Sequence, residues 1–254
     1  MSIEHILLLI GVGVVAGIIN IMAGGGSLLT LPSLVFLGLP GAVANGTNRL
    51  AILLQNAVAT YQFFRDGYSD FKLSLTLTLC ALPGTILGAW AGTHLGGIWF
   101  NRVLAGVMVL VMILMAQRRK KNHSQTIPND NQQISKRRYY SAHALMLLVG
   151  LYGGFIQAGV GFIIMAVLHR VLKLDLIRVN MHKVFIVGSY TVVALAVFAL
   201  SGEVNWVAGL TLAAGNATGG ILGTKLAIKK GEKLIRIFLY VILTVMVIKL
   251  LISH

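Results

Sequence analysis

The chain is a succession of apolar runs, several of them as long as the roughly 20 residues that a helix needs to cross a bilayer. The runs are 6–22, 27–37, 43–64, 71–94, 99–116, 142–158, 162–172, 179–200, 206–228 and 234–252. Only 11% of the 254 residues are charged, whereas soluble domains contain about 25%. This composition excludes a soluble enzyme, a disordered chain and a secreted disulfide scaffold. It predicts an all-α, polytopic helical membrane protein.

The basic residues gather in alternate segments between these runs. Lys and Arg number 21 against 7 Asp and Glu, which gives a net charge of +14. Seventeen of the 21 lie in four segments: 65–72, 118–138, 170–178 and 225–236. The other connecting loops contain no Lys or Arg: 38–42, 93–99 and 201–205. Because cytoplasmic loops of membrane proteins are enriched in Lys and Arg, the four basic segments are predicted to be cytoplasmic.

The two halves of the chain repeat one pattern at a constant offset of 135 residues, as from Gly24 to Gly159. The segment Ala-Gly-Gly-Gly at 23–26 corresponds to Ala-Gly-Val-Gly at 158–161, and Ile-Leu-Gly at 86–88 recurs at 221–223. No gap is needed to keep these motifs in one register. Apolar segments resemble one another by composition, but a shared register across several motifs indicates an internal repeat.

The repeat and the charge pattern together predict that the two halves are inverted in the membrane. Each half then contains a Gly-broken helical hairpin, 6–37 or 142–172, followed by three transmembrane helices. The predicted domains are the first transmembrane repeat, a basic cytoplasmic linker and the second transmembrane repeat, at 1–117, 118–140 and 141–254. Both termini face outward in this arrangement. The protein is expected in the cell membrane, which is the inner membrane in a Gram-negative bacterium.

In a helix, each residue is rotated by about 100° from the one before it. With this rotation, polar side chains share one face of the run 43–64. The members that we select as substrate ligands are Asn45, Asn48, Arg49 and Asn56. In the second half, Asn180 and Lys183 occupy the positions of Asn45 and Asn48, and His182 lies beside Lys183. A charge inside a span usually faces a cavity or a partner, so we expect this face to line a binding site. The alternative is that Arg49 and Lys183 extend to the membrane surface as anchors.

Glycine-rich stretches interrupt the first apolar element of each half. The selected residues are Gly24, Gly25, Gly26 and Ser27 in the first half, and Gly159 and Gly161 in the second. A helix that begins at such a break presents free backbone N–H groups and the positive end of its dipole. Glycine also lets a substrate approach the backbone closely. We therefore expect a broken-helix anion site, with close helix packing as the alternative explanation for the glycines.

No acidic residue accompanies Arg49 and Lys183 within the apolar runs, because all seven Asp and Glu fall in predicted loops or at span ends. An anionic substrate is therefore the expected counter-ion. His182 belongs to the residue type that titrates near neutral pH, although a lone histidine is more often structural. Without an HExxH motif or an intramembrane Asp pair, the chain is predicted to be no enzyme and to hold no cofactor or metal. Nucleic acid is not an expected partner of the basic linker.

Three motifs resemble the sulfite exporter TauE/SafE family. They are AGGGSLLTLP at 23–32, LGLP at 37–40 and ANGTN at 44–48, and their repetition after a polar middle segment is similar to that family as well. The resemblance implies a membrane transporter for small sulfur-containing anions such as sulfite, sulfonates or sulfoacetate. The second copy departs from the pattern, with Val160 in place of the middle glycine and Met-His-Lys at 181–183 in place of Gly-Thr-Asn.

The sequence thus predicts a secondary transporter that exports a small anion. The anion is expected to bind near mid-membrane, at the interface of the repeats. Membrane lipids are expected partners, and a homodimer is compatible with the sequence. Two alternatives stay open. One is a carrier or channel for another small anion or a neutral solute, and the other is a non-transporting membrane scaffold that recruits partners through the basic linker.

The predicted orientation can be tested with reporters. Alkaline phosphatase, which is active only outside the cytoplasm, should be active when fused to the C-terminus and inactive when fused within 118–138. A fluorescent protein that requires the cytoplasm should give the opposite pattern. A C-terminal reporter that works only in the cytoplasm would refute the outward termini.

Overall fold

The computed structural model describes residues 1–117, 135–229, 244 and 248, and within these residues the regular structure is entirely helical. The helices are α1 (Ile3–Ala23), α2 (Ser27–Phe36), α3 (Gly41–Arg65), α4 (Phe71–Thr93), α5 (Gly97–Gln117), α6 (Lys136–Phe155), α7 (Val160–Ala166), the π-helical turn η2 (Val167–Val171), α8 (Leu176–Leu200) and α9 (Trp206–Lys229). The predicted all-α class is confirmed. Apart from residues 244 and 248, the expected span 234–252 lies outside the described residues. Helix α6 begins at Lys136, inside the segment 118–140 expected as a linker.

Three of the described helices are by themselves long and apolar enough to cross a membrane: α1, α4 and α8. Helix α3 is as long as α8, but the polar residues along one face lower its mean hydropathy. Large apolar side chains such as Leu79, Trp90, Leu148 and Leu210 are exposed on the outside of the bundle. Because such side chains avoid water, this surface suits the hydrocarbon of a bilayer.

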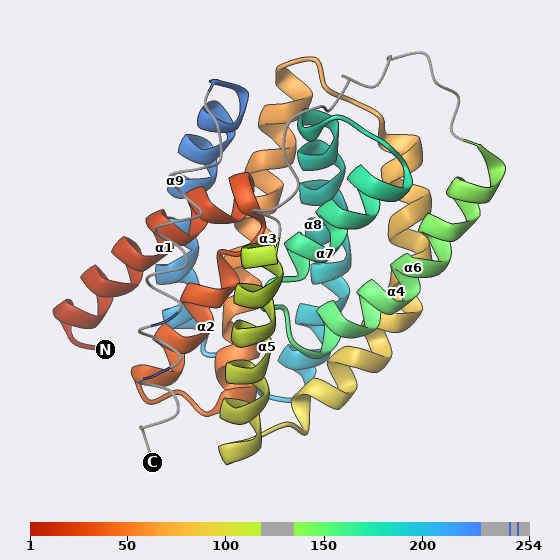
Figure 1. Cartoon of the computed structure of the whole chain (residues 1–254). Helices are drawn as coiled ribbons and strands as arrows, with labels where there is room; N and C mark the ends of the chain where they lie inside the picture. The colour runs from red at the N-terminus through yellow and green to blue at the C-terminus, as the bar shows by residue number, and fades with distance from the viewer. Residues whose placement is uncertain (118–134, 230–243, 245–247, 249–254) are drawn as a thin grey trace.

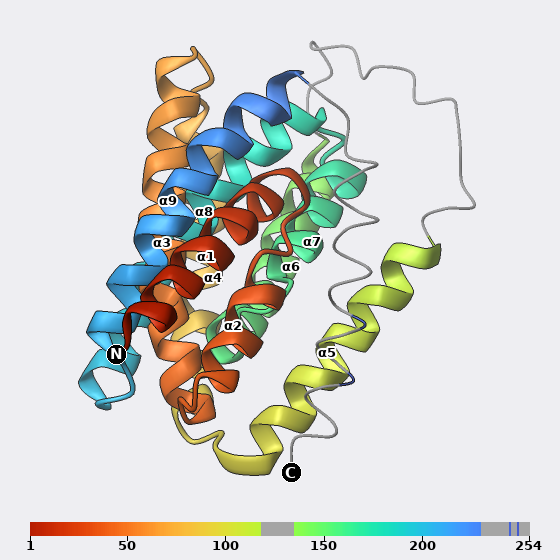
Figure 2. The same ribbon diagram turned by 90° about the vertical axis from the view of Figure 1, so that its left-hand side faces the viewer.

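Both predicted helix breaks are present. Helix α1 ends at Gly24, whose φ of 83° is left-handed and whose N–H donates to the carbonyls of Ile19 and Asn20. In the second half, Gly159 has a φ of 70° and directly precedes α7. Glycine adopts these angles without steric cost. The chain reverses direction at each break, so that α2 runs back beside α1 and α7 runs back beside α6 (Figures 1 and 2).

The two halves interlock through two equivalent helix pairs. Helix α1 packs along α9, and α6 packs along α4, so each pair joins one helix from each half. A Cβ added to Gly17 would lie 2.5 Å from the Asn216 carbonyl oxygen, and one on Gly88 would lie 2.0 Å from that of Leu151. Small residues allow such close backbone contact between membrane helices. The pairing follows the internal repeat, while the inversion of the repeats in the membrane stays a prediction.

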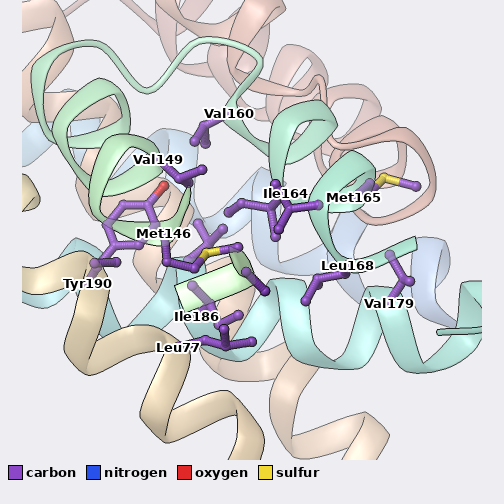
Figure 3. Packing of buried hydrophobic residues seen from close by; sticks show 14 of the residues in the cluster. Leu77, Met146, Val149, Val160, Ile164, Met165, Leu168, Val179, Ile186 and Tyr190 are labelled. Carbon is purple, nitrogen blue, oxygen red and sulfur yellow. The ribbon is translucent and has the colours of Figure 1, made fainter. Parts of the chain in front are cut away.

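Helices α3 and α8 lie antiparallel between these pairs and carry most of the buried polar residues. Apolar side chains from α4, α6 and α8 pack around α7 and η2, and Met146, Ile164, Leu168 and Ile186 belong to this one buried cluster (Figure 3). This packing fixes the second break against the centre of the bundle.

The connections sort into two ends of the molecule. The α3–α4 loop, the α7–α8 connection and the end of α9 lie at the top of Figure 1, and these carry basic residues. The α2–α3, α4–α5 and α8–α9 connections lie at the bottom. We call these the basic end and the opposite end. Their separation follows the alternation of charge along the sequence, and which end faces the cytoplasm stays a prediction.

Substituting Gly88 with Ala tests the α4–α6 contact. The added methyl group meets backbone atoms of α6, so we expect a loss of about 1–3 kcal/mol in stability. The matched control is Gly106→Ala on α5, where an added Cβ has no neighbour within 4 Å. Thermal unfolding in detergent should show a lower midpoint for Gly88→Ala only, and equal midpoints would contradict the packing.

Candidate functional site

The two helix breaks touch each other at the centre of the bundle. A Cβ added to Gly24 would lie 2.6 Å from the carbonyl carbon of Gly161, and one on Gly161 would lie 2.4 Å from the Gly24 carbonyl oxygen. Ser27 Oγ, at the start of α2, donates to the carbonyl oxygen of Gln157 at 3.1 Å. Only glycine at Gly24 and Gly161 permits this backbone contact.

A small cavity lies beside this crossing of the breaks. Its polar lining consists of Asn20, Ser27, Asn56, Gln157 and Lys183. The water-accessible volume is about 10 Å³, which is close to the space that one water molecule requires. An anion with several oxygen atoms therefore needs the surrounding helices to separate before it can enter.

Lys183 of α8 caps the interrupted helix of the first half. Its Nζ donates to the carbonyl oxygens of Ile21 at 2.7 Å and Asn20 at 3.0 Å, and to Asn180 Oδ1 at 2.8 Å. The last carbonyls of a helix lack intrahelical partners and form the negative end of its dipole. The ammonium therefore satisfies the end of α1 while it borders the cavity.

Arg49 of α3 caps the interrupted helix of the second half. Nη1 donates to the Gly153 carbonyl oxygen at 3.0 Å and Nη2 donates to that of Gly154. Asn45 completes the cap, because its Nδ2 donates to the Phe155 carbonyl oxygen at 2.7 Å and its Oδ1 accepts from Arg49. The guanidinium also lies 4.5 Å from the centre of the Phe198 ring.

The two cations thus have equivalent partners, each at the broken helix of the other half. Arg49 is fully buried and Lys183 is 2% exposed, so neither extends to the surface as an anchor. Helix carbonyls already balance part of their charge. The lack of a buried carboxylate therefore does not by itself require an anionic substrate. Lys183 borders the cavity and Arg49 does not.

The other predicted ligands divide between the cavity and its supports. Asn56 lines the cavity and donates to the Ile52 carbonyl oxygen at 2.7 Å. Asn48 lies outside it and accepts from Thr30 Oγ1 at 2.5 Å, which joins α3 to α2. His182 faces α4, with Nδ1 2.7 Å from Ser74 Oγ. The second imidazole nitrogen of His182 lies 4.0 Å from a carboxylate oxygen of Asp70.

The predicted glycines also have separate places. Gly24 and Gly161 form the crossing, and Gly159 supplies the left-handed turn before α7. Gly26 packs against α1, since an added Cβ would lie 2.3 Å from the Ala16 carbonyl oxygen. The Gly25 carbonyl oxygen accepts from the N–H of Leu28 in the first turn of α2.

Two polar residues of the cavity wall, Asn20 and Gln157, were not predicted from the sequence. Asn20 Nδ2 donates to Gln55 Oε1 at 3.2 Å, and Gln157 Nε2 donates to Thr191 Oγ1 at 2.9 Å. Gln157 Oε1 is buried without a hydrogen-bond partner. Each is a polar residue in an apolar stretch directly before a glycine break, and that position was the available signal.

Polar side chains converge on the cavity. One ammonium, three amide side chains and one hydroxyl surround it, and such convergent polar groups orient a ligand in a mostly apolar protein interior. In the described parts of the chain, no three His, Cys, Asp or Glu residues are grouped to hold a metal ion.

Comparison with known proteins identifies the family. The model of the sulfite exporter TauE/SafE family matches residues 9–250. The chain belongs to the sulfite exporter TauE/SafE family. This match covers nearly the whole chain and confirms the family that the glycine motifs resemble.

Relatives of this TauE/SafE protein match it along almost their full length. It is 28% identical to the probable membrane transporter protein YfcA of Escherichia coli (strain K12), over 94% of this chain and 87% of the relative. It is 27% identical to the probable membrane transporter protein ORF9 of Sinorhizobium sp, over 93% and 88%. It is 24% identical to the probable membrane transporter protein YunE of Bacillus subtilis (strain 168), over 93% and 94%. No solved structure matches the chain. The TauE/SafE protein is a multi-pass membrane protein of a transporter family.

Replacing Arg49 with Met tests the cap on α6. The substitution leaves the Gly153 and Gly154 carbonyls buried without a donor, at a cost of about 1–3 kcal/mol for each unsatisfied group. Thermal unfolding should therefore show a clear loss of stability, partly restored in Arg49→Lys. The control is Arg102→Met, because Arg102 is exposed beside Trp99. Equal stability of the two Met variants would exclude the capping role.

Proposed function

We propose that this protein is a secondary transporter that exports a small sulfur-containing anion, such as sulfite, a sulfonate or sulfoacetate. The substrate binds in the cavity where the two helix breaks cross. The observation that supports this site best is the position of Lys183, whose ammonium borders a buried cavity together with amide and hydroxyl groups from both halves.

The polar lining matches the chemistry of a sulfur oxyanion. The amide nitrogens of Asn20 and Gln157 each use one N–H within the protein and keep a second for the oxygen atoms of the anion, and Lys183 adds positive charge. The start of α2 at Ser27 contributes the positive end of a helix dipole. Charged hydrogen bonds are stronger in a dry interior than in water, so few contacts suffice for selective binding.

The membrane potential favours export of the anion over its uptake. A negative cell interior drives a monovalent anion outward by about 2.3 kcal/mol per 100 mV. Export by this route needs no coupled ion. This agrees with the placement of all seven Asp and Glu in loops or at the ends of apolar runs, where none is an obvious proton carrier within a span.

Alternating access requires the crossing to open on one side at a time. The cavity is too small for a sulfur oxyanion while Gly24 and Gly161 are in contact. Rocking of one repeat against the other separates the breaks without unfolding either hairpin.

Flux measurements in proteoliposomes test the proposed function. Sulfite efflux should rise when the lumen is made electrically negative, and Lys183→Met should abolish most of it. Gln157→Leu removes one substrate contact and should raise KM about tenfold with a smaller effect on kcat, since a lost hydrogen bond to an anion is worth about 1.4 kcal/mol or more.

The matched control for Gln157 is Gln62→Leu. The Gln62 amide oxygen is also buried without a partner. Gln62 lies near the C-terminal end of α3, however, and does not line the cavity. This variant should keep the wild-type KM. Absence of sulfite flux in the wild type would reject the proposed substrate, and unchanged flux in Lys183→Met would reject the site.

A further inference from the structure

The two cation caps lie on opposite sides of the cavity. Helices α3 and α8 are antiparallel and meet at Asn56 and Gly188, where a Cβ on Gly188 would lie 3.3 Å from Asn56 Cβ. At 1.5 Å of rise per residue, Arg49 lies about 10 Å from this point along α3, and Lys183 lies about 8 Å from it along α8. Because each cation lies toward the start of its own helix, Arg49 is displaced toward the opposite end and Lys183 toward the basic end (Figure 1).

Each cap also joins the two halves at a place that must separate for the cavity to open. Lys183 and Asn180 connect α8 to the end of α1, and Arg49 and Asn45 connect α3 to the end of α6. Helix α1 then leads into the first break and α6 leads into the second. Access from the basic end therefore requires the end of α1 to leave α8, and access from the opposite end requires the end of α6 to leave α3.

In the dry interior of a membrane, a cap of this kind can break at low cost only on the side from which water enters. A carbonyl that loses its donor in a dry core remains unsatisfied, whereas a carbonyl at an entering water column is solvated at once. The cap on the other side therefore keeps its partners and stays closed.

We propose that these two caps are the gates of the transport path. Lys183 with Asn180 closes the cavity toward the basic end, and Arg49 with Asn45 closes it toward the opposite end. In the structure both caps are formed, and the cavity is correspondingly small. The inference rests on the proposed function only in assuming that the crossing of the breaks is the part of the protein that opens.

A cysteine in the cavity wall measures each gate separately. Cys80 is the single cysteine of the chain, so Cys80→Ala with Val187→Cys gives one thiol, at an apolar position that lines the cavity. A membrane-impermeant thiol reagent is applied to sealed vesicles of either orientation. Cysteines placed at Ser69 in the α3–α4 loop and at Ser201 in the α8–α9 loop, both exposed, report which end each preparation presents.

We expect sided effects of about tenfold or more on the labelling rate, because each substitution removes hydrogen bonds to a charged group. Lys183→Met should raise labelling from the basic end only, and Arg49→Met should raise it from the opposite end only. If both substitutions raise labelling from the same end, or neither raises it, the gates are refuted.

Two further pairs of variants keep the test decisive if a Met variant folds poorly. Asn180→Ala and Asn45→Ala keep the cations and remove their supporting amides, so they should give the same sidedness with smaller increases. Lys183→Arg and Arg49→Lys keep a donor at each helix end and should stay closed. Labelling needs no transport, so sided opening in a protein that does not move sulfite would reject the proposed substrate and leave the gates standing.

Discussion

The whole arrangement depends on the need to pair every backbone polar group inside a membrane. Two helices of this protein end near the middle of the bundle, and each leaves carbonyl groups without an intrahelical partner. Arg49 and Lys183 supply the missing donors, each from a helix of the other half. The interruptions and the buried cations therefore explain one another, because neither would be tolerated without the other.

Close backbone contact makes this pairing possible. Glycines at the α1–α9 and α4–α6 interfaces bring the helices near enough for side chains of α3 and α8 to contact the broken ends. Gly24 and Gly161 then place one break directly against the other. The same contacts that satisfy the backbone leave a small polar cavity between the halves.

Much of the fold was predictable, and the roles in the site were predictable only in part. The apolar runs located the described helices, and the glycine motifs located the breaks at Gly24 and Gly159. Arg49 was predicted to touch substrate because no acidic partner is available within its run. Its contact with substrate stays a prediction, and the structure adds the carbonyls of Gly153 and Gly154 as partners. These belong to the backbone, so no residue type indicates them. Gln157 was missed because its importance comes from its place in the cavity wall beside residues of the other half, such as Ser27, which is 130 residues away in the chain.

The sequence by itself determined the helical class, the positions of the two breaks and the repeat that relates them. These properties follow from local hydrophobicity and from the backbone freedom of glycine, which act over a few residues. The tertiary structure decided which cation caps which helix, and which of the polar residues face the cavity. Those outcomes depend on how segments from opposite halves cross, and the crossing is set by packing between surfaces that are distant along the chain.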